Sequence, residues 1–140
     1  MIKIVQIWFE GEWMYGRDAC GEVYRQSYLW YPRLYLATPE QRNAYELGID
    51  GAHWRNIDED ISFDSFIDRR DIEPNPMQRF FLTHREMNVS GIAKKMNLNP
   101  SLLAGYVYGW KKPSAKRVKE IEEGIRAYGR QLEEVSFTEK

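Results

Sequence analysis

The sequence predicts an α+β protein, in which a small domain with an antiparallel or mixed sheet precedes an all-α domain. Apolar residues alternate with a period of two at the start of the chain, and after residue 76 they repeat at helical spacing. In residues 1–73, 8 Lys and Arg against 14 Asp and Glu give a net charge of −6, whereas 12 against 7 give residues 74–140 a net charge of +5. These shifts predict domains at residues 1–70 and 77–135, joined by a linker at residues 71–76 that contains two prolines.

Three strands are expected at the start of the chain. The first contains Ile2, Ile4 and the apolar cluster at residues 7–9, and it ends at the Glu-Gly-Glu turn of residues 10–12. Residues 13–17 and 22–26 alternate in the same way on either side of a turn that contains Gly21.

The next stretch predicts two helices and a further strand. Thr38 and Gln41 enclose a proline in the pattern of a capping box, so a helix is expected from there to about Leu47, ending at Gly48. Residues 51–54 predict a fourth strand. Ser62 is expected to cap a short helix through Ile67, with acidic residues in its first turn.

Four short motifs in this half resemble the bacterial domain-of-unknown-function family 2442. They lie, in order, at residues 30–34, 37–42, 53–54 and 58–62, and the resemblance covers roughly residues 3 to 67. The chain departs from the family at Arg55, where members usually have proline. Members are often encoded beside a second small protein in arrangements that look like toxin–antitoxin pairs. The resemblance therefore implies a binding role with a small protein partner, and some members also carry a C-terminal helix-turn-helix.

The second half predicts a phage-repressor-type (lambda-repressor-like) helix-turn-helix domain. Its first two helices are expected at residues 77–85 and 89–96, and small Ala93 would lie where the second helix crosses the third. Asn97 suits a left-handed turn between the second and third helices. Asn99 and Pro100 can begin a third helix that ends at Gly109, and a fourth helix is expected from residue 115, carrying Val118, Ile121, Ile125 and Leu132.

The third helix is poor in side chains that could read bases. In this fold the base-reading positions would be Pro100, Ser101 and Gly105, and only Ser101 can form a hydrogen bond there. Lysines and an arginine before and after this helix could instead contact phosphates. The predicted DNA-binding residues are Lys94, Lys95, Asn99, Ser101, Lys111, Lys112, Lys116 and Arg117.

We therefore expect a DNA-binding transcriptional regulator, antitoxin-like, that binds double-stranded DNA as a homodimer with weak base readout. The alternative is a protein-interaction adaptor whose helix-turn-helix scaffold no longer binds DNA. Aromatic residues are dense between positions 8 and 35, more than so small a domain readily buries, which suggests an interface. Ordinary core packing would explain them equally well. They are Trp8, Phe9, Trp13, Tyr15, Tyr24, Tyr28, Trp30, Tyr31 and Tyr35.

No pattern in the sequence favours catalysis, a cofactor or a metal. His53 and the acidic residues 58–60 are the only cluster of suitable types, but adjacent side chains on an extended segment point in different directions. His84 is expected at the edge of the core, and the single Cys20 excludes an internal disulfide. The chain lacks a long apolar run and a recognisable signal peptide, so a cytoplasmic protein without membrane contact is expected.

Overall fold

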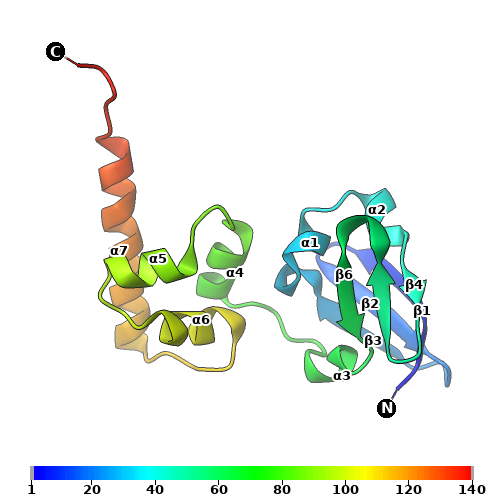
Figure 1. Ribbon diagram of the computed structural model, residues 1–140. Coiled ribbons are helices and arrows are strands. Elements are labelled where there is room, and N and C mark those ends of the chain that lie inside the picture. The colour runs from blue at the N-terminus through cyan, green and yellow to red at the C-terminus, as the bar shows by residue number, and fades with distance from the viewer. Residues whose placement is uncertain (1, 140) are drawn as a thin grey trace. The chain divides into compact units, whose positions relative to one another are not determined.

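The computed structural model describes residues 2–139 and confirms the α+β class (Figure 1). Two three-stranded antiparallel sheets lie in the N-terminal half, and helices make up the C-terminal half. The chain divides into two compact units, one ending at Thr83 and the other beginning at His84. The predicted linker, residues 71–76, lies within the first unit, where the backbone N–H of Asp71 donates to the carbonyl of Arg25.

The first sheet has the three strands that the alternation predicted. They are β1 (Ile4–Glu10), β2 (Trp13–Asp18) and β3 (Val23–Ser27), in the order β1-β2-β3. Gly11 has a φ of 58° in the tight turn between β1 and β2, a conformation that glycine adopts without strain. One face of the sheet packs on the core through Ile4, Ile7 and Met14.

The second sheet contains one predicted strand and two that were not predicted. Its strands are β4 (Glu46–Leu47), β5 (Gly51–Trp54) and β6 (Glu59–Ser62), in the order β4-β5-β6. Ala52 and Trp54 of β5 and Ile61 of β6 point into the core, and the alternate residues form the outer face.

Short helices connect these strands, and two predicted helix boundaries are wrong. The helical elements are η1 (Tyr28–Trp30), α1 (Pro32–Tyr35), α2 (Pro39–Asn43), η2 (Arg55–Ile57), α3 (Ser65–Asp68) and α4 (Pro76–Thr83). The capping box of α2 is confirmed in both hydrogen bonds, but α2 ends at Asn43 and not near Leu47. Trp54 donates to the carbonyl of Arg42, and the next residues leave the helix to form β4. Ser62 lies in β6, so α3 begins after Asp64 instead.

The aromatic residues between positions 8 and 35 are buried or half-buried. Tyr24, Tyr28 and Trp30 belong to the buried set. Half-buried rings contact arginines: the Arg25 guanidinium carbon lies 3.9 Å from the Trp13 ring centroid. Trp8 and Tyr15 stack with their centroids 5.5 Å apart. Packing within the chain thus accounts for these rings, and an aromatic interface remains a prediction.

The second unit contains α5 (Val89–Lys95), α6 (Pro100–Tyr108) and the long α7 (Ala115–Glu133). The helices α5 and α6 begin and end within about one residue of the predicted positions, and α7 begins where the fourth helix was expected. The expected first helix of this half corresponds to α4, which lies in the first unit, where Arg79 pairs with Glu12 at 2.7 Å. His84 is exposed and not at the core edge as predicted, because α4 ends at Thr83.

Candidate nucleic-acid interface

The turn between α5 and α6 is a complete Schellman motif. Asn97 has a φ of 56°, its N–H donates to the carbonyl of Lys94, and the N–H of Leu98 donates to the carbonyl of Ala93. Ala93 is fully buried, and α5 and α6 pack closely against each other. The small side chain at position 93 and asparagine in the left-handed region therefore fix the geometry of the two helices.

The start of α6 is capped and exposed. The Asn99 carboxamide oxygen accepts from the backbone N–H of Ser101 at 2.8 Å, and Pro100 occupies the first turn. Ser101 itself is exposed. Asn99 thus has a structural role at this end, while the Ser101 hydroxyl is available to an approaching ligand.

One turn further along, α6 is covered by its own chain. Gly105 is buried, and a Cβ added there would lie 2.9 Å from the Trp110 indole nitrogen and 3.0 Å from Cγ of Lys111. The chain folds back because Gly109 has a φ of 93°, and the N–H of Lys111 donates to the carbonyl of Gly105. Trp110 and Lys111 therefore cover Gly105, so this expected base-reading position is not accessible to DNA bases.

Trp110 belongs to an aromatic stack that the sequence reasoning missed. Its ring stacks on Tyr108 with centroids 5.6 Å apart and an interplanar angle of 12°, and 63% of Trp110 is exposed. Arg85 donates to the Tyr108 hydroxyl at 3.0 Å. The glycine between the two aromatic residues was the available signal, because a left-handed Gly109 reverses the chain and lets both rings lie on one side.

The predicted basic residues fall into two groups. Lys111, Lys112 and Lys116 are exposed in the α6–α7 loop and the first turn of α7, and Arg117 beside them pairs with Glu120 at 3.1 Å. Lys94 and Lys95 lie in the last turn of α5.

Contacts with α7 place the second group away from the first. The Lys95 ammonium lies 5.4 Å from the Tyr128 ring centroid, and Met96 packs against Gly124. Gly124 is eight residues beyond Lys116, which is about 12 Å along a helix. The structure therefore brings together the lysines of the loop and of the α7 N-terminus, and it places Lys94 and Lys95 apart from them.

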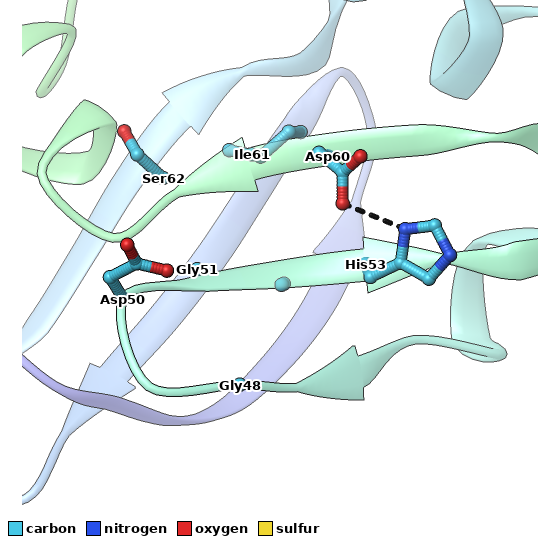
Figure 2. A pocket seen from close by; sticks show the side chains of 8 residues that line it. Gly48, Asp50, Gly51, His53, Asp60, Ile61 and Ser62 are labelled. Atoms are coloured by element: carbon cyan, nitrogen blue, oxygen red, sulfur yellow. Dashed lines mark hydrogen bonds and ion pairs between the residues drawn. The ribbon is translucent and has the colours of Figure 1, made fainter.

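His53 lies on the outer face of the second sheet, facing Asp60 across the β5–β6 pair. Its Nδ1 is 2.7 Å from an Asp60 carboxylate oxygen, beside a shallow hollow of about 420 Å³ that Asp50 and Ser62 also line (Figure 2). Figure 2 shows the other ring nitrogen of His53 directed away from Ser62. The side chains of Ser62, His53 and Asp60 therefore do not form a nucleophile–base–acid relay.

The acidic residues beside His53 do not converge. Asp58 has a φ of 51° at the end of η2, and its carbonyl accepts from Arg33, whereas Asp60 faces His53. Burial raises the pKa of Glu59. Among residues 2–139, no group of three or more His, Cys, Asp or Glu side chains could hold a metal ion.

In the same part of the chain, no helix combines the length and the apolar character that crossing a bilayer requires.

Residues 20–71 match the family described as protein of unknown function DUF2442. The matched stretch runs from the β2–β3 turn to just past α3 and covers less than half of the chain. It supports the predicted resemblance of the N-terminal half, and it does not extend to the helical unit. No curated protein and no solved structure matches the chain.

Proposed function

We propose that α5 and α6 form a helix-turn-helix that binds double-stranded DNA mainly through its phosphates, in a transcriptional regulator. The observation that carries this proposal is the cationic group at the N-terminus of α7. Lys116 and Arg117 lie in its first turn, which has no acidic residue, and Lys111 and Lys112 precede it. Arg117 pairs with Glu120 within α7, but lysines at this end oppose the helix dipole, so the presence of the lysines does not serve helix stability. The same arrangement of N–H groups and cations suits a phosphate.

Base readout is weak in this proposal because α6 offers few polar groups. Ser101 is the exposed hydroxyl of its first turn, and Gly105 is covered by Trp110 and Lys111. The phosphate contacts would set the affinity, and sequence preference would come from Ser101 and from DNA shape.

Replacing Ser101 by alanine is expected to change the affinity for random-sequence duplex by less than about twofold and to relax preference at no more than one base pair. The change removes one hydroxyl and keeps the Asn99 cap, which uses the backbone N–H of residue 101. Selection from a randomised duplex library, followed by sequencing, measures the preference. A loss of preference at several positions would show that α6 reads bases, contrary to the proposal.

The alternative function is a protein-interaction adaptor that has kept this scaffold. The exposed Trp110, stacked on Tyr108, favours it, because tryptophan and tyrosine are frequent anchors at protein interfaces. The adaptor predicts no measurable duplex binding even at about 50 mM salt, where phosphate contacts are strongest. An antitoxin-like regulator would combine DNA binding with binding of a small protein partner. In such a regulator the α+β unit would bind the partner.

A further inference from the structure

The exposed tryptophan of the α6–α7 loop lies on the same face of α6 as Ser101. Ser101 and Gly105 are four residues apart, so both lie on one side of the helix. A Cβ added at Gly105 would lie 2.9 Å from Nε1 of Trp110, which places the indole against the helix at that turn. A duplex that contacts Ser101 would therefore meet Trp110 where a side chain of residue 105 would otherwise be.

The Trp110 ring is held in place by its neighbours and offers mainly hydrocarbon to a ligand. Its Nε1, the one polar atom of the ring, lies beside Gly105. The Tyr108 ring stacks on it with an interplanar angle of 12°, and Arg85 donates to the Tyr108 hydroxyl. With 63% of the residue exposed, Trp110 thus presents an ordered apolar surface, which lowers the entropic cost of a contact with a ligand.

The surroundings of Trp110 are cationic, and this charge selects DNA as the occupant of the surface. Lys111 and Lys112 follow the ring directly in the sequence, and both are exposed. Cγ of Lys111 lies beside the indole, 3.0 Å from the same added Cβ at Gly105. Residues 87–119, which include α5, α6 and the loop, contain seven lysines and arginines and no acidic residue. An apolar ring among these cations suits a polyanion that also carries apolar groups.

We infer that Trp110 contacts the 5-methyl group of thymine in the major groove. The inference rests on the proposed DNA binding and deepens it, because it names the base that the loop prefers. Base pairs present hydrogen-bond donors and acceptors in the major groove, and the thymine methyl is the apolar group among them. The hydrocarbon surface of Trp110 matches this methyl group and none of the polar edges. A·T pairs are therefore favoured opposite the second turn of α6.

A comparison of duplexes that contain thymine with the same duplexes containing uracil tests the inference, because uracil lacks only the methyl group. The wild-type affinity for an A·T-rich duplex, measured by fluorescence anisotropy near 0.1 M salt, is expected to fall by about fourfold or more when uracil replaces thymine. Trp110→Ala is expected to bind the thymine duplex at least about fivefold more weakly, and to bind both duplexes alike. Its salt slope should equal that of the wild type, because no phosphate contact is removed.

The two substitutions together separate a methyl contact from an effect of uracil on DNA shape. A shape effect would persist in Trp110→Ala, whereas a contact with the methyl group would disappear. Phe137→Ala is the matched control: Phe137 is a second aromatic residue, 93% exposed, and its replacement should keep the wild-type preference for thymine.

Three results would overturn the inference. A wild type without a preference for thymine, or an equal preference in Trp110→Ala, would do so and leave the proposed duplex binding intact. Tighter binding to a single strand of the same sequence would show that the ring stacks on unpaired bases instead. The absence of duplex binding at about 50 mM salt would overturn the proposed function together with the inference, and Trp110 would then serve the adaptor.

Discussion

Replacing Ala93 by glutamate is expected to lower the free energy of unfolding of the helical unit by about 3–4 kcal/mol. Ala93 is fully buried in α5, where that helix packs on α6, and its carbonyl accepts from the N–H of Leu98. A glutamate there would place an unpaired carboxylate in an apolar contact and separate the two helices. The Schellman turn at Asn97 would lose its geometry with them.

Thermal unfolding followed by circular dichroism measures this effect, with Ser90→Glu as the control. Ser90 is exposed in the first turn of the same helix, where an acidic side chain is compatible with the helix dipole. The control is expected to stay within about 0.5 kcal/mol of the wild type. An Ala93→Glu protein that melts within about two degrees of the wild type would show that α5 and α6 do not pack as described.

Changing Lys111 and Lys112 together to alanine is expected to weaken binding to every duplex by about tenfold or more near 0.1 M salt. Both lysines are exposed in the loop before α7, and the loss of two phosphate contacts should flatten the slope of log affinity against log salt by about 1.8. Because phosphates carry no base identity, random and selected duplexes should lose affinity alike.

Fluorescence anisotropy with labelled duplexes at several salt concentrations provides both quantities. Lys3→Ala is the control, because it removes an exposed lysine from the other unit and should change neither affinity nor slope. Sequence-selective binding that survives the double change would place the DNA-contacting surface elsewhere.

Local patterns in the sequence predicted the elements whose geometry is set locally. The alternation of residues 13–17 predicted β2, Thr38 and Gln41 predicted the start of α2, and Asn97 predicted the left-handed turn. The end of α2 depends instead on distant residues. The Ile7 N–H donates to the Tyr45 hydroxyl, and Glu46 of β4 pairs with His53 of β5. The chain therefore leaves the helix for contacts that no local pattern encodes.

Part of the candidate nucleic-acid interface was likewise predictable from the sequence, and part depends on the tertiary structure. The lysines around the α7 N-terminus are neighbours in sequence, so their proximity followed directly from their positions. The distance of Lys95 from them depends on how α5 packs on Tyr128 of α7, which requires the tertiary structure. The covering of Gly105 depends on the reversal at Gly109, and a sequence pattern indicates such a turn without showing which side chains it brings back.

The salt dependence of wild-type binding to a random-sequence duplex tests the central proposal most directly. A titration at about 50 mM and about 200 mM salt should show binding at the lower concentration and a loss of about 10²-fold at the higher one, because about four phosphate contacts release counterions. The absence of measurable binding at the lower salt concentration would contradict the proposal and favour the adaptor. Binding with little dependence on salt would also contradict it, because phosphate contacts could not then supply the affinity.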